Sequence, residues 1–273
     1  MRKIVEKNLL VEHIPVSIQL PQNERNNLGK RTINEQKRRT THLRRLQVIR
    51  LKRCPTIDKF SERYKQDDVK QMLKVTYLNK CGYCEQYSES WHVEHYRPKN
   101  GGYEYLTYSW DNLIFCCPTC NIYKSKKFDI RGVKAVYKDE DLANIHTLCQ
   151  TYNATEQPLL LHPEYDSAEE DFVFDENGQI LTGQITNERL IYTIESVCKL
   201  NRKPLIDRRK EIVIDKLLKD IDAVVLKNAD NKEVLNHKIE GIIEAFVSAS
   251  QCESEEFTVF RKYVVTHFLA KMI

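Results

Sequence analysis

Two CxxC motifs constrain the fold of this 273-residue sequence more than any other feature. They occupy residues 81–84 and 117–120, with 32 residues between them. A CxxC turn brings two thiolates within a few ångström of each other, which makes half of a tetrahedral zinc site, and two such turns complete it. The sequence therefore predicts a compact unit, with an inserted segment between the turns. Its structural Zn²⁺ would be bound by Cys81, Cys84, Cys117 and Cys120.

Other uses of these cysteines have less support. A thioredoxin-type redox role needs a βαβ context around the motif, and the sequence does not provide one. Cys116 lies next to Cys117 and is the alternative ligand, but the spacing to Cys120 favours Cys117. The total of nine cysteines is odd, which argues against a disulfide framework.

The composition predicts a globular protein of the cytoplasm. Hydrophobic residues make up 41% of the chain, which is enough for a substantial core. No apolar run approaches the ~20 residues that a membrane span needs. Residues 1–7 carry charges where a signal peptide would be apolar. We therefore expect neither membrane insertion nor secretion.

Charge is distributed unevenly along the chain. Residues 1–80 contain 20 Lys and Arg against 8 Asp and Glu, whereas the remainder has a net charge of −8. The densest basic stretch, residues 30–53, contains no Gly or Pro and predicts a basic helix. Such a helix attracts phosphate through counterion release. The alternatives are a solvated face, docking on the acidic half of the chain, or docking on a partner.

Hydrophobic periodicity gives the organisation of the chain. Residues 67–78 predict a helix before the first CxxC motif, and residues 172–181 predict a hairpin around an Asn-Gly turn. From residue 187 onward, apolar residues recur at helical spacing. We therefore predict an α+β fold, mostly α, in four parts. These are a basic N-terminal helical arm (1–66), the metal-stapled core (67–135), a connecting segment with a short hairpin (136–186) and a C-terminal helical domain (187–273).

The segment around the CxxC motifs carries an ordered set of polar residues. Glu94 and His95 come first, and Asn112 follows directly before a leucine. Asn121 comes directly after the second CxxC motif and is followed, three residues later, by a lysine. This order resembles the HNH endonuclease family in its zinc-knuckle variant, over residues 81–127. The resemblance implies a ββα-metal core, in which one helix crosses a β hairpin around a catalytic Mg²⁺ or Mn²⁺.

The resemblance also implies a role for each polar residue. His95 would be the general base that deprotonates the attacking water, and Glu94 would bind the divalent ion. Asn112 would hold the hairpin loop and orient the base. Asn121 would be the last metal ligand, at a place where many members have His, and His92 is a candidate additional ligand. One imidazole and one metal ion together supply the needs of phosphodiester hydrolysis.

Basic residues near these positions complete the implied site. The resemblance assigns them as phosphate contacts: Arg97, Lys99, Lys124, Lys126 and Lys127. Each assignment has a purely structural alternative. A histidine in a strand is commonly a partly buried structural residue, and Asn is common in the first turn of a helix.

A closer resemblance is to the PtuB-type nuclease subunits of Septu and retron-associated anti-phage systems. It rests on residues 81–85, 93–99 and 110–113, and on residues 159–163 and 200–202 farther along the chain. It implies a toxic DNA-cleaving effector that works with a PtuA-like ATPase partner, with a retron reverse transcriptase complex as a further partner.

Two alternatives stay open at the level of sequence. The first is an effector that cleaves RNA such as tRNA, because a base and a metal ion recognise phosphate geometry more than sugar identity. The second is a catalytically silent adaptor that uses the zinc-stapled unit to bind nucleic acid or protein. The acid beside the imidazole, Glu94 and His95, favours an enzyme, because a binding module does not need that pair.

Overall fold

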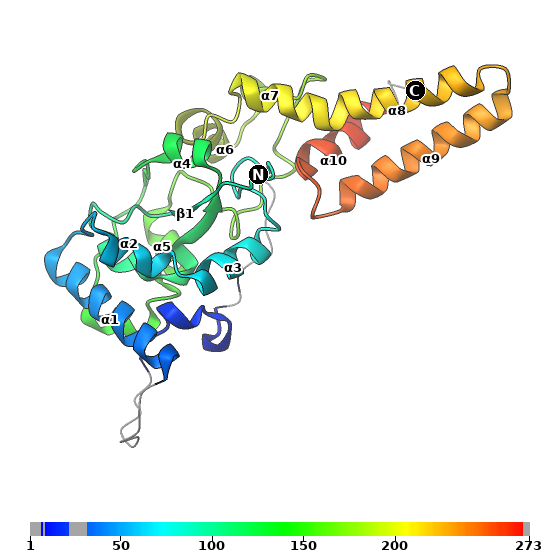
Figure 1. The fold of residues 1–273 in the computed structure, drawn as a ribbon. Helices are drawn as coiled ribbons and strands as arrows, with labels where there is room; N and C mark the ends of the chain where they lie inside the picture. Colours follow the sequence, from blue (N-terminus) through cyan, green and yellow to red (C-terminus); the bar gives the residue numbers. More distant parts are fainter. Residues whose placement is uncertain (1–6, 8, 22–31, 270–273) are drawn as a thin grey trace.

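A computed structural model describes residues 7, 9–21 and 32–269 of the chain (Figure 1). Three sequence predictions extend past these limits. Residues 1–6, 8 and 22–31 of the predicted N-terminal arm lie outside the described residues. The first residues of the basic helix, 30 and 31, and the end of the C-terminal domain, 270–273, lie outside the described residues. The described chain is mostly helical with one small sheet, which confirms the predicted fold class.

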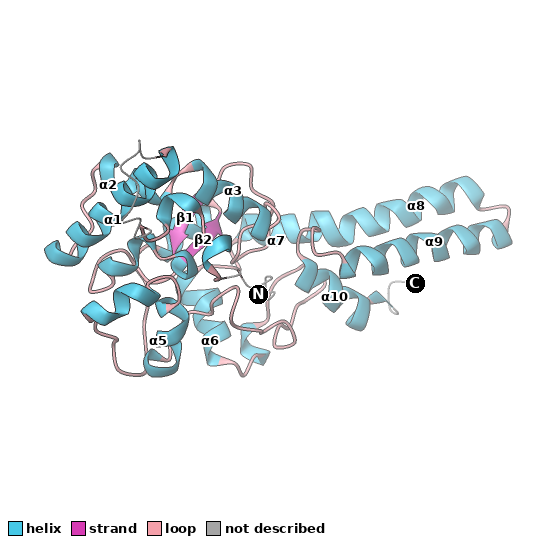
Figure 2. Cartoon of the chain, turned by 90° about the horizontal axis from the view of Figure 1, so that it is seen from below, coloured by secondary structure: helices cyan, strands magenta, loops and turns pink. Residues whose placement is uncertain are grey.

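The sheet lies at the centre of the larger half of the molecule (Figure 2). It consists of two antiparallel strands, β1 (His92–His95) and β2 (Leu113–Cys116), in which Glu94 pairs with Ile114. All four residues of β2 are buried. Short helices fill the connection between the strands, and an α-helix follows β2. These elements are η3 (Glu104–Tyr108), η4 (Trp110–Asn112) and α4 (Pro118–Lys124).

The N-terminal part is helical and packs against this centre. Its elements are η1 (Val11–His13), η2 (Val16–Ile18), α1 (Ile33–Leu51), α2 (Asp58–Tyr64) and α3 (Asp67–Thr76). The Thr32 hydroxyl caps α1 by accepting a hydrogen bond from the Glu35 N–H, and the helix ends at Lys52, where φ is 49°. The predicted basic helix and the predicted helix before the first CxxC motif are both confirmed. The basic face of α1 is not wholly solvated, because the Arg45 side chain is buried.

The connecting segment contains two 3-10 helices and one α-helix. These are η5 (Asp139–Asn144), α5 (Leu148–Glu156) and η6 (Thr182–Gln184). A single antiparallel bridge joins Phe174 to Ile180, and Gly178 in the turn between them has a φ of +81°. This confirms the predicted hairpin, in which the turn needs a residue that tolerates positive φ.

In the C-terminal part, all regular structure of residues 187–269 is helical. Its elements are α6 (Glu188–Ile191), α7 (Lys203–Arg209), α8 (Lys216–Asn228), α9 (Lys232–Gln251) and α10 (Thr258–His267), with π-helical segments η7 (Tyr192–Val197) and η8 (Lys210–Asp215). Helices α8 and α9 pack antiparallel and extend away from the rest of the molecule (Figures 1 and 2). The helical periodicity that the sequence shows from residue 187 is thus confirmed.

One apolar cluster connects these parts. It extends from Ile14 in the N-terminal segment, through Phe115 of β2, to Phe260 of α10. Phe115 stacks against Trp91 with ring centroids 4.3 Å apart, so the cluster supports the hairpin directly. Within the described residues, no helix combines the length and the apolar character that a membrane crossing requires.

Candidate metal centre and active-site cleft

The four cysteines of the two CxxC motifs converge on one point. The Sγ atoms of Cys81, Cys84, Cys117 and Cys120 all lie within 4.8 Å of one another, and all four residues are buried. A tetrahedron with Zn–S bonds of ~2.3 Å places its sulfur atoms ~3.8 Å apart, and the Cys84 and Cys117 Sγ atoms are 3.8 Å apart. The cluster could therefore hold a metal ion.

Local backbone geometry brings these thiols together. Cys117 is the N-cap of α4, where its Sγ accepts a hydrogen bond from the Cys120 N–H, and Pro118 occupies the first turn. In the first motif, a Cβ at Gly82 would lie 2.7 Å from the Tyr77 ring, so a larger residue would displace the turn. Cys116 is buried but does not belong to the cluster, in agreement with the CxxC spacing. All nine cysteines are free, as expected.

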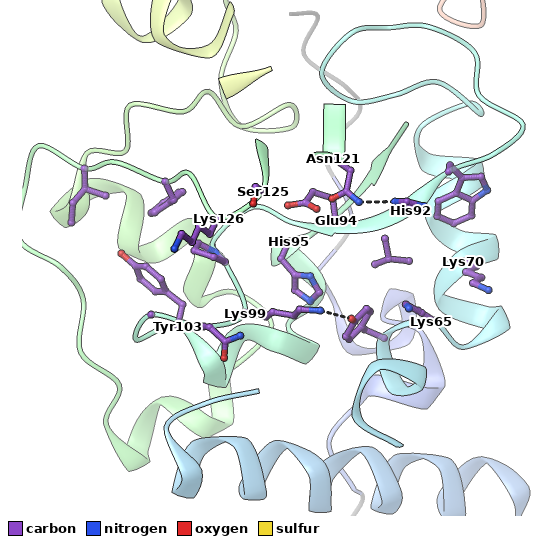
Figure 3. Close-up of a pocket in the computed structure, with 18 of the residues that line it drawn as sticks. Lys65, Lys70, His92, Glu94, His95, Lys99, Tyr103, Asn121, Ser125 and Lys126 are labelled. Carbon is purple, nitrogen blue, oxygen red and sulfur yellow. Dashed lines mark hydrogen bonds between the residues drawn. The ribbon is translucent and has the colours of Figure 1, made fainter. Parts of the chain in front are cut away.

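A cleft of about 960 Å³ opens beside the sheet (Figure 3). His92, Glu94 and His95 of β1 line it, as does Asn121 of α4. Strand β1 and the first turns of α4 meet here because the CxxC cluster fixes the start of α4 next to the hairpin. The structure thus brings four of the predicted site residues to one cavity.

The His95 imidazole has a defined orientation. Its Nε2 atom lies 3.0 Å from the Thr107 carbonyl oxygen in η3. A carbonyl oxygen only accepts hydrogen bonds, so Nε2 carries the proton and Nδ1 keeps the lone pair. The Tyr64 ring packs edge-on against the imidazole at 4.6 Å. Burial, with a further contribution from the positive charge of Lys99, lowers the pKa of His95 to about 3, so the ring is neutral at pH 7.

Asn112 fastens the chain that follows His95. Its Oδ1 atom accepts a hydrogen bond of 2.7 Å from the Arg97 N–H, and its Nδ2 donates to the Arg97 and Leu106 carbonyls. The side chain is fully buried, so all of these bonds are shielded from water. Asn112 therefore ties the residues after β1 to η3, the same element whose Thr107 carbonyl holds the imidazole.

Glu94 is a buried carboxylate with a charged partner. Its Oε1 atom accepts a hydrogen bond of 2.8 Å from Lys124 Nζ, which also donates to the His95 carbonyl. The Lys124 side chain has 0% of its surface exposed. Lys124 therefore neutralises Glu94 and connects α4 to β1, and it does not offer its charge to a bound phosphate. This differs from the prediction of a phosphate contact.

Asn121 and His92 lie side by side at the rim of the cleft (Figure 3). The Asn121 Nδ2 and His92 Nδ1 atoms are 2.6 Å apart. When Asn121 donates through Nδ2, its Oδ1 stays available to a cation, together with the Glu94 oxygen that Lys124 does not use. Carboxylate and amide oxygens are the donors that a hard divalent cation prefers, so the residues present fit such an ion.

The other predicted phosphate contacts divide into two groups. Lys99 and Lys126 line the cleft. Lys127 donates to the Ser196 carbonyl and does not belong to the cleft lining. Arg97 is 0% exposed and forms a buried ion pair of 2.7 Å with Glu156. Its guanidinium is buried against that carboxylate, which favours a structural role for Arg97 over the predicted phosphate contact.

Comparisons with known proteins agree with this geometry. Residues 80–127 match the family model of the HNH endonucleases. The chain contains an HNH domain. This domain contains both strands, α4 and the cysteine cluster. It also contains the cleft residues His92, Glu94, His95 and Asn121.

Two curated proteins resemble a longer part of the chain. Septu protein PtuB of Bacillus mycoides (strain KBAB4) is 29% identical over 180 residues, which cover 59% of this chain and 56% of PtuB. Septu protein PtuA of the same strain is 27% identical over 166 residues, which cover 55% of this chain and 22% of PtuA. The chain thus spans about half the length of PtuB and less than a quarter of PtuA. No solved structure matches the chain significantly.

The structure adds cleft residues that sequence reasoning missed. Tyr64, Lys65 and Lys70 come from α2 and α3 and the turn between them, before the HNH domain begins, and Lys134 comes after it ends. Trp91 directly precedes β1 and also lines the cleft. The position of Trp91 beside His92 was a signal in the sequence. The others had none, because only tertiary packing brings them to the cleft.

Proposed function

We propose that this chain is a metal-dependent endonuclease that hydrolyses phosphodiester bonds of nucleic acid. One observation carries the proposal: a neutral imidazole, that of His95, is held by a backbone carbonyl in a lysine-lined cleft, which the carboxylate of Glu94 also lines. A silent binding module would not need a histidine held in a single tautomer next to an acid.

His95 acts as the general base. Its Nδ1 lone pair takes a proton from water, the water oxygen bonds to phosphorus, and the bond between phosphorus and the leaving sugar oxygen breaks. The Thr107 carbonyl stabilises the imidazolium that forms, because it accepts a hydrogen bond from Nε2 throughout. A phosphodiester bound near Lys99 offsets the charge that depresses the pKa of His95, so the base becomes stronger when substrate is present.

Glu94 and Asn121, with His92 beside them, would hold the catalytic Mg²⁺ or Mn²⁺. A divalent ion at such a site neutralises charge on the scissile phosphate and on the leaving oxygen. The chain contributes the orientation of the donors. Lys124 holds Glu94 through a hydrogen bond. Asn121 is held by its position in α4, the helix that starts at the cysteine cluster. In this proposal the cysteine cluster holds Zn²⁺ and has a structural role.

The biological setting that fits best is a Septu-type anti-phage system. The resemblance to both PtuB and PtuA supports this setting, and it is partial along both proteins. We propose DNA as the substrate and a PtuA-like ATPase as the partner subunit. The names of the two relatives contain no reference to a retron, so a reverse transcriptase is not part of the proposal.

The decisive experiment measures cleavage by the purified chain. Plasmid DNA, single-stranded DNA and total RNA are incubated with Mg²⁺, with Mn²⁺ or with EDTA. The His95→Ala variant is assayed in the same way. His237→Ala is the matched control, because His237 is exposed on α9. We expect metal-dependent cleavage that falls about 10²–10⁴-fold in His95→Ala and does not change in the control. Cleavage that survives His95→Ala would exclude this base, and absence of all cleavage would favour the adaptor.

A further inference from the structure

The cleft carries a strong excess of positive charge outside the residues assigned to catalysis. Five lysines line it, and Glu94 is the single carboxylate among the described lining residues. Figure 3 shows Lys65 and Lys70 on one side of His95 and Lys126 on the other. Lys65 lies in the turn between α2 and α3, and Lys70 lies on α3. The N-terminal helices therefore form one wall of a basic channel, and the HNH domain forms the other. The channel passes over His95.

The lysines of both walls are available to a ligand. The side chains of Lys65, Lys70 and Lys126 are exposed, and within the described part of the chain none of the three has a carboxylate partner. The other two cleft lysines are engaged with uncharged groups. Lys99 donates to the Tyr64 hydroxyl, and Lys134 donates to the Gly101 carbonyl. Among the residues that the structure describes, no carboxylate forms a salt bridge with any of these five lysines, so the channel favours a polyanion.

An aromatic platform lies in the same channel. The Trp91 indole stacks on buried Phe115 at 4.3 Å with an angle of 20° between the rings. Trp91 is half-buried, and it also lines the cleft beside His92. A rigid indole next to a basic groove is the arrangement on which unpaired bases stack in proteins that bind single strands. Bases within a duplex already stack on their neighbours and do not present a free face.

We propose that the cleft binds an unpaired nucleic-acid strand, DNA or RNA, that runs between the two walls. Lys65 and Lys70 bind phosphates on one side of the scissile bond, Lys126 binds a phosphate on the other, and Trp91 stacks on a base. This inference rests on the proposed nuclease function and specifies its substrate.

Binding can be measured separately from cleavage. Fluorescence anisotropy with labelled oligo(dT), oligo(U) and a DNA duplex of equal length is recorded over a range of salt concentrations, without added Mg²⁺ or Mn²⁺. We expect both single strands to bind more tightly than the duplex. We expect Lys65→Ala/Lys70→Ala to raise Kd roughly ten-fold and to lower the slope of log Kd against log salt by about 0.7 for each lost phosphate contact. Lys74→Ala is the control, because Lys74 is exposed on the same helix and does not line the cleft.

The aromatic contact has its own test. Trp91→Ala should raise Kd for single strands by about ten-fold without a change in the salt dependence, and Trp91→Phe should restore most of the affinity, because stacking needs only an aromatic ring. Tighter binding of the duplex, or an equal effect of Lys74→Ala, overturns the inference. If single strands bind as expected but are not cleaved when Mg²⁺ or Mn²⁺ is added, the proposed function fails and the binding channel stands. If strands are cleaved but the cleft variants bind with wild-type affinity, the binding channel is excluded and the proposed nuclease function stands.

Discussion

The cysteine cluster and the cleft are attached to the same β hairpin, yet they are built in different ways. Two short motifs supply the whole cluster, which is buried and chemically uniform. The cleft draws on α2, α3, β1, η3 and α4, and its groups are held by backbone carbonyls and buried ion pairs. The contrast shows that a cysteine cluster able to hold a metal can be specified locally, whereas the cleft depends on packing between distant segments.

The two sites also differ in how they contribute to stability. A structural metal site releases much of the free energy of folding when the ion binds, so its loss affects the whole unit. Exposed lysines that line a cleft contribute little to stability, because like charges repel and water solvates them well. Buried polar residues such as Asn112 and Arg97 should make an intermediate contribution to stability, because they hydrogen-bond beneath the surface of the cleft. Substitutions at the three levels should therefore separate folding from function.

The largest expected effect is at the cysteine cluster. Cys84→Ser removes one of four ligands, and we expect the bound zinc to fall well below one ion per chain and the cooperative thermal transition to be lost. Metal analysis and calorimetry on the purified protein measure both. Cys252→Ser is the matched control, because Cys252 is exposed and lies outside the cluster. A Cys84→Ser protein with full zinc content and unchanged Tm would contradict the metal-centre assignment.

Arg97 tests whether a basic residue of the motif serves the fold or the substrate. Arg97→Met leaves Glu156 buried without its charged partner, and we expect a loss of ~3–5 kcal/mol in the free energy of unfolding. Urea denaturation measures it. Lys203→Ala breaks an exposed pair with Asp207 and should cost less than ~1 kcal/mol. If Arg97→Met instead keeps its stability and loses only affinity for nucleic acid, Arg97 is a phosphate contact after all.

Asn112 should affect both stability and cleavage. Asn112→Ala removes three buried hydrogen bonds to backbone groups, and we expect a loss of ~1–3 kcal/mol in stability because the Arg97 N–H is left without its acceptor. The loop after His95 then loses its anchor, and displacement of His95, the proposed base, should lower kcat roughly 10²-fold. Zinc content should stay at the wild-type level. Asn144→Ala, at an exposed position, is the control for both measurements. Unchanged kcat in Asn112→Ala would remove Asn112 from the support of the base.

The smallest effect is electrostatic. Lys99 lowers the pKa of His95, after the larger effect of burial, so Lys99→Met should raise this pKa from about 3. NMR titration of the His95 ring measures the change, and the acid limb of log kcat/KM should move to higher pH with it. Lys127→Met, outside the cleft lining, is the control. An unchanged His95 titration in Lys99→Met would show that Lys99 does not contribute to the lowered pKa.

The same shift has a consequence for stability. The pKa of His95 is lower in the folded chain than the ~6.5 of an unfolded chain, so its neutral form stabilises the fold above pH 6.5. This contribution decreases as the pH falls from about 6.5 toward 3, because the unfolded state takes up the proton first. In Lys99→Met the loss of stability should begin at the same pH, because the pKa in the unfolded chain is unchanged. It should be complete at a higher pH, because the pKa in the folded chain is raised.

The sequence allowed much of the HNH domain to be predicted, for identifiable reasons. The CxxC spacing separated Cys117 from Cys116, and the Glu-His pair and the helix after the second CxxC placed β1 and α4 at the cleft. Helical periodicity gave the C-terminal helices. The sequence was a weaker guide to the surroundings of the predicted phosphate contacts. Charge along the chain does not show which lysines and arginines are buried, and Arg97 and Lys124 both proved to have carboxylate partners.

What the sequence determined by itself is the local chemistry: four thiols at two fixed spacings, an acid next to an imidazole, and the helices. Each depends on backbone geometry over a few residues, which residue order controls directly. The tertiary structure alone decided the tautomer of His95, the pairing of Lys124 with Glu94 and the lysine walls contributed by α2 and α3. These features join residues far apart in the chain. Only packing of the common core determines which of those residues meet, and which of them keep their charge exposed to a ligand.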